Sequence, residues 1–362
     1  MLEWKSIGTI CSNIFAGGTP STKHLEYYDG TIPWIRSGEI DFNVITKAER
    51  NITELGYKNS SAKKIRPNSV VMAMTGATVA KSAVVEIETT ANQSVCAMET
   101  DESVVNYKYL FYYLAEEYFA IKSSAQGALT SLNLAMIKQI QIPIPSLSDQ
   151  SRIVGILDTF TASIENLKQR IEQRRKQYAH YSNNLLKHVD RKESIWKKLS
   201  ELADIFKGPY ITKKDSNEGE FPVIMGGQKV AYYIDRYNSE GESIVISRSG
   251  INAGFVSFWN QPIFVSDGYR IDNKEIINKK YLFYFLKKNE DIINSSKKGA
   301  GVPHIQSNYL LSFLILVPSL PEQQRIVSIL DTFEASIANL EQQLAQRERQ
   351  YEYYRNKLLT FE

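Results

Sequence analysis

An internal repeat constrains this chain more than any other feature of its sequence. Residues 150–186 align without a gap onto residues 323–359, with 23 identities in 37 positions. A weaker similarity continues upstream, where residues 69–76 resemble 243–250 and residues 109–114 resemble 281–286. The chain is therefore a duplication in which each half holds a globular region followed by a near-identical segment.

The repeated segment is predicted to be one long helix. It contains no proline and one glycine, Gly155, and its apolar positions recur at alternating steps of four and three. That period of about 3.5 residues is typical of a coiled coil. Arg174 and Arg347 occupy matching positions of this stripe, where they either fix the register or extend to solvent, and we favour the register. The residues expected to pair the helices are Ile153, Leu157, Phe160, Ile164, Leu167 and Ile171 in the first copy and Ile326, Leu330, Phe333, Ile337, Leu340 and Leu344 in the second.

The two helices are expected to pair with each other. Each would be about 55 Å long at about 1.5 Å per residue, and a helix of that length with an apolar stripe needs a partner. The long connection between them permits parallel pairing, antiparallel pairing, or packing of each helix on its own domain. We favour antiparallel pairing, which relates the equivalent halves by a pseudo-twofold axis and places the globular regions at opposite ends of the pair.

The fold class is predicted to be α+β. Both globular regions are strand-rich and mixed, with short β-branched runs between turn residues, one helix each at 107–122 and 279–293, and final strands at 140–145 and 313–318. The expected boundaries are a first domain at 1–149, a helix at 150–188, a linker at 189–194, a second domain at 195–321 and a second helix at 322–362.

The residue inventory favours a binding protein over an enzyme. Two cysteines exclude a disulfide framework and a four-thiolate zinc site, and the four histidines form no HExxH motif. No phosphate-binding GxxxxGK[ST] loop is present. The sequence shows no apolar run of about 18 residues and no signal peptide, so the expected location is the cytoplasm. The net charge of +3 names no partner by itself.

Two related domains on a rod suit a ligand that repeats along a line, and duplex DNA is such a ligand. A rod of about 55 Å corresponds to roughly 16 base pairs, so the domains would address two half-sites. Because the two domains differ in sequence, the half-sites would differ as well. Two alternatives remain open: a two-headed coiled-coil scaffold for proteins, and a stand-alone DNA-binding regulator without enzymatic partners.

Several motifs resemble those of the specificity subunit of type I restriction-modification systems. These are Gly17-Gly18-Thr19-Pro20-Ser21 followed by Ile32-Pro33-Trp34, then Ile142-Pro143-Ile144-Pro145-Ser146-Leu147 with Gln150 and Ile153, and Val317-Pro318-Ser319-Leu320-Pro321-Glu322-Gln323 with Arg325-Ile326. The resemblance covers essentially the whole chain. The second region departs from it, since Lys207-Gly208-Pro209-Tyr210 stands where the first has its glycine pair.

The resemblance implies a non-catalytic subunit whose globular regions are target-recognition domains, together reading a bipartite, asymmetric DNA site. It implies two methylation subunits that carry S-adenosylmethionine, restriction subunits that use ATP and Mg, no membrane, and no cofactor in this chain. Arg suits a guanine edge and Asn or Gln an adenine edge. We therefore expect Arg36, Arg248, Gln228 and Asn252 to read bases, and the lysines to hold phosphates. The full predicted set of DNA-binding residues is Arg36, Ser37, Thr75, Thr78, Lys81, Gln126, Thr130 and Ser131 in the first domain, and Lys213, Lys214, Gln228, Arg248, Ser249, Asn252, Lys297, Lys298 and His304 in the second.

Overall fold

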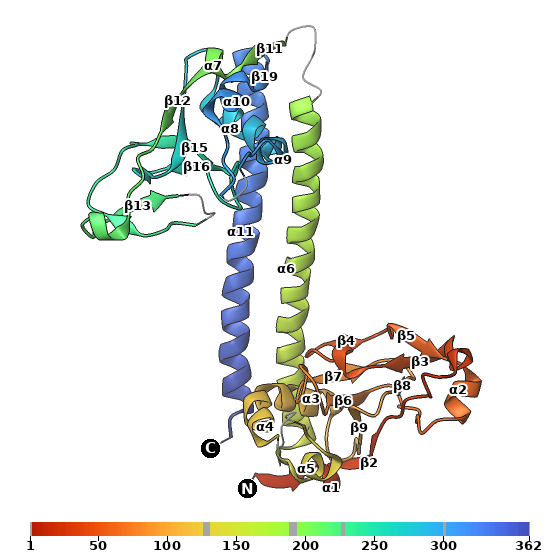
Figure 1. Cartoon of the computed structure of the whole chain (residues 1–362). Coiled ribbons are helices and arrows are strands. Elements are labelled where there is room, and N and C mark those ends of the chain that lie inside the picture. Colours follow the sequence, from red (N-terminus) through yellow and green to blue (C-terminus); the bar gives the residue numbers. More distant parts are fainter. Residues whose placement is uncertain (1, 126–130, 188–193, 226–228, 300–301, 362) are drawn as a thin grey trace. The chain divides into compact units, whose positions relative to one another are not determined.

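The computed structural model describes residues 2–125, 131–187, 194–225, 229–299 and 302–361. The chain divides into two compact units. Unit 1 comprises Met1–Leu167 and Gln343–Glu362, and unit 2 comprises Lys168–Gln342. Each unit therefore contains one globular region and a segment of each long helix (Figure 1).

The globular region of unit 1 is built on two sheets and a two-stranded ribbon. Its strands are β1 (Glu3–Ser6), β2 (Cys11–Ala16), β3 (Tyr28–Ile35), β4 (Val44–Ile45), β5 (Arg50–Ile52), β6 (Ser69–Ala73), β7 (Ser82–Val85), β8 (Thr90–Ala91), β9 (Val95–Thr100) and β10 (Gln141–Ile144). Its helices are α1 (Ile7–Ile10), η1 (Leu25–Tyr27), η2 (Ser37–Glu39), α2 (Glu54–Lys58), α3 (Tyr107–Glu116), α4 (Tyr118–Ser124) and α5 (Leu134–Gln139), followed by the long helix α6 (Leu147–Lys187). The sheet orders are β2-β9-β6-β7-β4 and β5-β3-β8, and β1 pairs antiparallel with β10.

The globular region of unit 2 repeats this plan. Its strands are β11 (Ile195–Lys198), β12 (Ala203–Lys207), β13 (Phe221–Ile224), β14 (Tyr233–Ile234), β15 (Glu242–Ser247), β16 (Val256–Asn260), β17 (Phe264–Val265), β18 (Gly268–Asn273) and β19 (Leu314–Val317). Its helices are α7 (Leu199–Leu202), η3 (Lys213–Asp215), α8 (Lys279–Lys288), α9 (Glu290–Ser295) and α10 (Ser307–Ser312), followed by α11 (Leu320–Leu359). The order β12-β18-β15-β16 matches β2-β9-β6-β7, and β14-β13-β17 matches β5-β3-β8, so the duplication extends through the whole half.

The expected α+β class is confirmed, but one helix per domain is wrong. The helix expected at 107–122 is two helices, α3 and α4, which meet at Glu117, and that expected at 279–293 is α8 and α9, which meet at Asn289. Further helices of four to six residues, such as α5 and α10, are too short to show a periodic apolar pattern in the sequence. The strands at 140–145 and 313–318 are present as β10 and β19.

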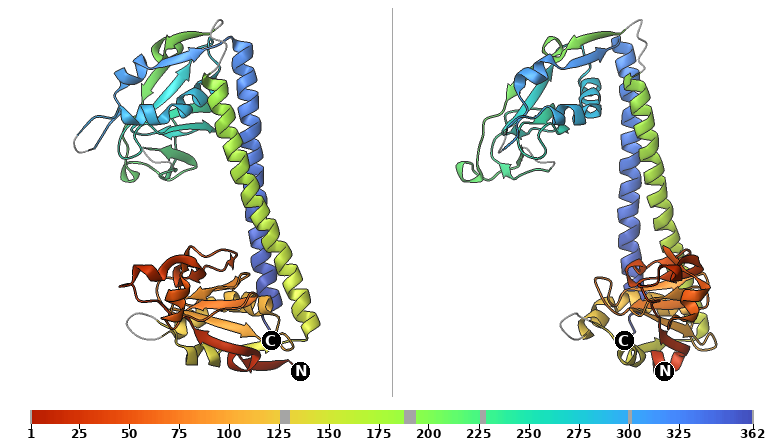
Figure 2. Two further views of the ribbon diagram at one scale, coloured as in Figure 1. Left: turned by 90° about the vertical axis from the view of Figure 1, so that its right-hand side faces the viewer. Right: turned by 45° about the vertical axis from the view of Figure 1, so that its right-hand side comes forward.

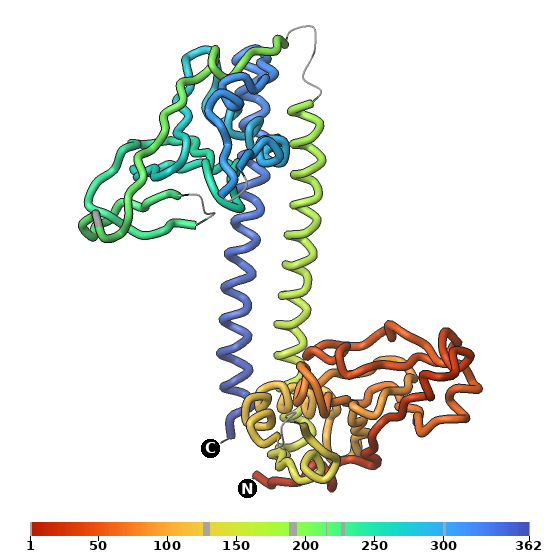
Figure 3. Tube along the Cα trace, viewed as in Figure 1, coloured from red at the N-terminus to blue at the C-terminus, as the bar shows by residue number. Residues whose placement is uncertain are grey.

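Both long helices begin earlier than expected, at Leu147 rather than residue 150 and at Leu320 rather than residue 322. In unit 1 the Ser146 hydroxyl accepts a hydrogen bond from the Asp149 amide at 3.1 Å, which is the role of an N-cap. Figure 3 traces the chain through both long helices. Of the linker expected at 189–194, residues 189–193 lie outside the described residues.

The two helices pack antiparallel within each unit, as predicted. In unit 1, the ring of Phe160 on α6 lies 5.4 Å from that of Tyr354 on α11, and the Arg347 guanidinium lies 5.5 Å from the Phe160 ring. In unit 2, the repeat-related ring of Phe333 lies 5.3 Å from that of Tyr181, and Arg174 lies 5.6 Å from it. Each arginine therefore stacks on a phenylalanine of the partner helix, a cation–π contact consistent with setting the register.

The outer residues assigned to helix pairing have a second role. Ile153 and Leu157 are buried in one cluster with Tyr109 and Leu110 of α3, and Ile326 and Leu330 lie in the corresponding cluster with residues of α8. They do more than pair the helices, because the first turns of each long helix also complete the core of their own domain. The partner helix enters the same clusters through Leu359 in unit 1 and Leu186 in unit 2. Closer to the middle of the helices, Leu167, Ile171 and Leu340 are buried, while Phe160, Ile164, Phe333, Ile337 and Leu344 are half-buried.

Candidate nucleic-acid interface

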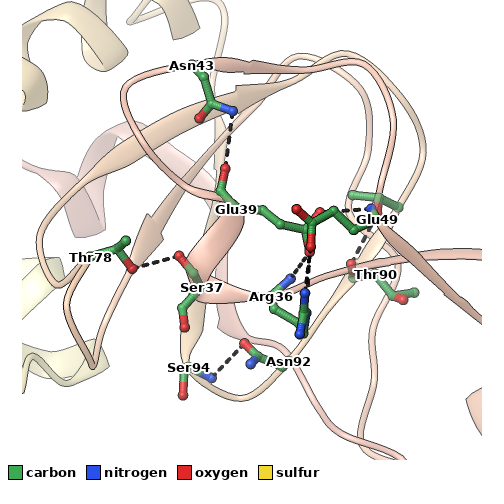
Figure 4. Close-up of polar contacts among 10 residues, drawn as sticks. Arg36, Ser37, Glu39, Asn43, Glu49, Thr78, Thr90, Asn92 and Ser94 are labelled. Atoms are coloured by element: carbon green, nitrogen blue, oxygen red, sulfur yellow. Dashed lines mark hydrogen bonds and ion pairs between the residues drawn. The ribbon is translucent and has the colours of Figure 1, made fainter. Parts of the chain in front are cut away.

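In unit 1, hydrogen bonds join the loops that follow strands β3, β6 and β8 and the segment that follows α4. The loop after β6 receives a hydrogen bond from the segment after α4, between the Leu132 amide and the Met74 carbonyl at 2.8 Å. The Met74 amide donates to Ser94 in the β8–β9 loop, also at 2.8 Å. The Thr78 hydroxyl donates to the Ser37 carbonyl at 2.7 Å, joining the β6–β7 loop to the loop after β3 (Figure 4). The structure thus brings together Ser37, Thr75, Thr78 and Ser131, whereas Gln126 and Thr130 lie outside the described residues.

Arg36, the reader expected in the first domain, is engaged by carboxylates. Its Nη2 donates to Glu49 at 2.6 Å, and its Nε lies 3.8 Å from a Glu39 oxygen (Figure 4). Its side chain is 39% exposed. A base edge would have to compete with both carboxylates for this guanidinium. Lys81 is similarly paired with Asp41, so neither cation is free among the residues described here.

The glycine pair of the first domain serves close packing. A Cβ on Gly17 would lie 2.2 Å from the Ala91 carbonyl oxygen, and one on Gly18 would lie 2.3 Å from the Ser61 carbonyl carbon. The Trp34 indole donates to the Gly18 carbonyl at 3.0 Å. This turn and its tryptophan are therefore part of the domain core.

In unit 2, two clusters that the sequence placed far apart form one site. Ser249 forms a β-bridge with His304, and His304 exchanges two backbone hydrogen bonds of 2.9 Å with Lys298. Arg248 lies beside them, since its carbonyl accepts from the Ile305 amide at 2.8 Å. Figure 2 shows this unit from two further sides. Arg248, Ser249, Lys298 and His304 therefore share one edge of the second domain.

The remaining predicted residues of unit 2 differ in their surroundings. Lys213 and Lys214 are exposed on η3, and Lys298 is exposed on its hairpin. Lys297 donates to the Asn294 side chain at 3.3 Å, and Asn252 is half-buried in the turn after β15. Gln228 lies outside the described residues.

The two domains place different side chains on equivalent backbone. Arg248 corresponds to Met74, because the carbonyl of each accepts the same bond, from Ile305 and Leu132 respectively. Asp267, which the sequence did not single out, occupies the place of Ser94, because each residue directly precedes the equivalent strand, β18 and β9 respectively. Arg248 Nε donates to Asp267 Oδ1 at 2.7 Å, whereas the first domain has Met74 and Ser94. One scaffold therefore carries two chemically different loop edges.

Both halves of the chain use the same hydrogen bonds to join the globular domain to the start of its long helix. Gln150 is 0% exposed; its side chain accepts from the Asn106 amide at 2.8 Å and donates to the Val104 and Pro145 carbonyls at 3.1 and 2.9 Å. Gln323 repeats this with the Asn278 amide at 2.7 Å and the Pro318 carbonyl at 2.9 Å. Asn106 and Asn278 in turn cap α3 and α8. The buried glutamine thus ties the start of the long helix to the first turn of the neighbouring helix.

Tyrosine–aspartate pairs extend the same joint by two turns. Tyr112 donates to Asp158 at 2.7 Å, and Lys108 donates to the same carboxylate at 2.7 Å. In unit 2, Tyr284 and Lys280 bond to Asp331 at 2.6 and 2.9 Å. Burial raises the pKa of both phenols, which therefore stay protonated donors. These joint residues were missed in the sequence, although identity at repeat-related positions was an available signal.

The described residues contain no cluster of three or more His, Cys, Asp or Glu side chains suited to a metal ion. In the same part of the chain, no helix is both long and apolar enough to cross a bilayer.

The comparisons with known proteins agree with this arrangement. A family model described as type I restriction modification DNA specificity domain matches residues 1–173 and again 193–349. The EcoprrI type I restriction enzyme specificity subunit of Escherichia coli is 26% identical over 92% of this chain and 88% of its own. A second Escherichia coli specificity subunit is 33% identical over 51% of this chain, and that match spans only 48% of the relative. The crystal structure of a type I restriction-modification S subunit from M. genitalium shares the fold, with a TM-score of 0.73, 17% identity, and coverage of 100% of this chain and 97% of that one. Two matched domains, each on a copy of the same helix, place this chain in the family of type I restriction-modification DNA specificity proteins.

Proposed function

We propose that this chain is the non-catalytic specificity subunit of a type I restriction-modification complex and reads a bipartite, asymmetric DNA site, one half-site per domain. The observation that carries the proposal is the duplicated scaffold with unlike edges: Met74 and Ser94 in one domain stand where Arg248 and Asp267 stand in the other. Equivalent edges that differ chemically suit two different half-sites. The proposal locates the chain in the cytoplasm.

A duplicated surface on the helices supports two identical partners. Arg152, Thr159, Asn166 and Gln173 lie at steps of seven along α6, are exposed, and recur as Arg325, Thr332, Asn339 and Gln346 on α11. On another exposed face the copies have diverged: Glu165, Lys168, Glu172 and Arg175 correspond to Ala338, Glu341, Ala345 and Glu348. The stability of the fold does not explain why the exposed residues are identical on one face of the two helices and different on another. We assign the shared face, the residues of the first series and its repeat, to one methylation subunit per helix copy.

The partners supply the chemistry in this proposal. S-adenosylmethionine belongs to the two methylation subunits, and ATP and Mg to the restriction subunits. This chain recognises the DNA sequence and binds the partner subunits, and it holds no cofactor.

Docking is tested by native mass spectrometry of the chain mixed with its methylation subunit. Thr159→Arg introduces a long cation into the shared face, and we expect the stoichiometry to fall from two methylation subunits to one. Glu172→Arg introduces the same side chain on the diverged face and should leave two. Retention of two subunits by the Thr159 variant would refute the assignment of this face.

DNA reading is tested by binding of the assembled methylation complex to matched and mismatched duplexes. Arg248→Ala should relax the sequence preference of one half-site, at a cost of about 1–3 kcal/mol. Lys214→Ala, which removes an exposed cation, should weaken all sequences alike and reduce the dependence on salt. Identical effects from both variants would contradict the division into readers and phosphate holders.

A further inference from the structure

Arg248 differs from Arg36 and Arg270 in which of its nitrogens are engaged. Only Nε is bonded, to Asp267 Oδ1 at 2.7 Å, and Nη1 and Nη2 make no hydrogen bond to any residue that the structure describes. In Arg270 the Nε and Nη2 atoms both bond to Asp272, and Nη1 donates to the Asn238 carbonyl. In Arg36, Nη2 is bonded to Glu49. Arg248 alone among these three keeps both terminal nitrogens available.

The carboxylate beside Arg248 is itself held firmly. Asp267 accepts from the Ser249 hydroxyl as well as from Arg248, and it has a positive φ of 48°. Its neighbours are anchored, because the Ser266 amide donates to Ile224 at 2.8 Å and the Gly268 carbonyl accepts from Gly208 at 2.8 Å. Burial alone would raise the pKa of Asp267, but the bonds from Ser249 and Arg248 outweigh burial and hold the pKa below its usual value. The carboxylate is therefore ionised at neutral pH.

The arginine is fixed at its backbone as well. Its carbonyl accepts from Ile305, and its side chain is only 22% exposed. A guanidinium reads guanine by donating two parallel hydrogen bonds, for which two of its nitrogens must be free and correctly oriented. A carboxylate that accepts a hydrogen bond from Nε alone meets both requirements. It orients the plane of the guanidinium and leaves Nη1 and Nη2 free to donate.

We propose that Asp267 is a positioning residue for DNA recognition, which orients Arg248 so that its two terminal nitrogens contact a guanine edge in the half-site read by the second domain. This inference rests on the proposed function. The first domain has Met74 and Ser94 at these positions, so the guanine contact belongs to the second half-site alone. Arg248 and Asp267 form one recognition unit that the first domain lacks.

The test is selection of bound duplexes from a randomised DNA pool by the full chain assembled with its methylation subunits. Arg248→Ala should remove the preference for one guanine, lowering its discrimination roughly 5- to 150-fold. Asp267→Asn should weaken preference for the same guanine about 2- to 12-fold, because the freed arginine must be ordered at each encounter. It should also strengthen non-specific binding, since it removes a negative charge facing DNA. A loss of structure would lower both the preference for the guanine and the non-specific affinity for DNA. A lower preference together with a higher non-specific affinity therefore indicates loss of positioning rather than loss of folding.

Two further variants complete the design. Asp272→Asn breaks an arginine–aspartate pair in the same strand region and should leave every base preference unchanged. In an Arg248→Ala background, Asp267→Asn should have no further effect on discrimination. If the native complex selects a two-part site and the Asp267 variant alters no guanine preference, the inference is wrong and the proposed function stands. If the native complex selects no site, the proposed function fails and the inference with it.

Discussion

Replacing Gln150 with leucine should loosen the first domain from its helix without disturbing the second. Gln150 is fully buried and satisfies three backbone groups: the Asn106 amide and the Val104 and Pro145 carbonyls. Leucine has a similar size but no polar atom. Each buried group left without a partner costs about 1–3 kcal/mol. Since single substitutions above about 4–5 kcal/mol are exceptional, we expect a loss of ~3–5 kcal/mol in local stability.

Amide hydrogen exchange of the isolated chain measures this effect locally. Peptides covering Tyr107–Glu116 should exchange roughly two to four powers of ten faster in the Gln150→Leu variant. Peptides covering Lys279–Lys288 should not change, and Gln323→Leu should give the converse result. The matched control is Gln173→Leu, which alters an exposed glutamine of the same helix. Equal acceleration in both domains, or none in the first, would refute the argument that this side chain joins one domain to its helix.

Three more predictions concern the tyrosine–aspartate joint and the two cysteines. Tyr284→Phe removes the hydroxyl that donates to Asp331. The free energy of unfolding measured in urea should fall by about 1.5–3 kcal/mol, as expected for a hydrogen bond to a charged acceptor. An unchanged urea midpoint would show that water replaces the hydroxyl. Burial raises the pKa of Cys11 and Cys96 to about 12, so neither thiol is ionised at pH 8, and iodoacetamide followed by mass spectrometry should label both only after unfolding. Because both values lie above the ordinary 9.0, the free energy of unfolding should be insensitive to these thiols below pH 9.0 and should fall as the pH rises from there toward about 12.

The sequence predicted those features that are encoded by local periodicity. The 3.5-residue stripe predicted two long helices, and duplication predicted that they pair; Phe160 against Tyr354 and Phe333 against Tyr181 confirm the antiparallel direction within each unit. The same stripe did not distinguish residues that pair the two long helices from residues that pack a helix on its own domain. An apolar side chain such as Ile153 or Leu157 suits either contact equally well.

The candidate site was only partly predictable. The loops containing Arg248 and His304 were each identified from turn residues. That the two loops lie side by side depends on backbone hydrogen bonds between segments far apart in the chain. Arg36 was expected to be a free reader, and the structure shows it paired with Glu39 and Glu49. Such pairings depend on loop geometry, for which the sequence contains no repeating pattern.

By itself, then, the amino-acid sequence determined the duplication, the paired helices and the family, because repeats and heptads are properties of residue order alone. Only the tertiary structure decided which side chains meet: Asp267 with Arg248, and Gln150 with the start of α3. Those contacts join residues that are 19 and 44 positions apart. Their geometry arises from how whole strands and helices pack, and no local spacing encodes it.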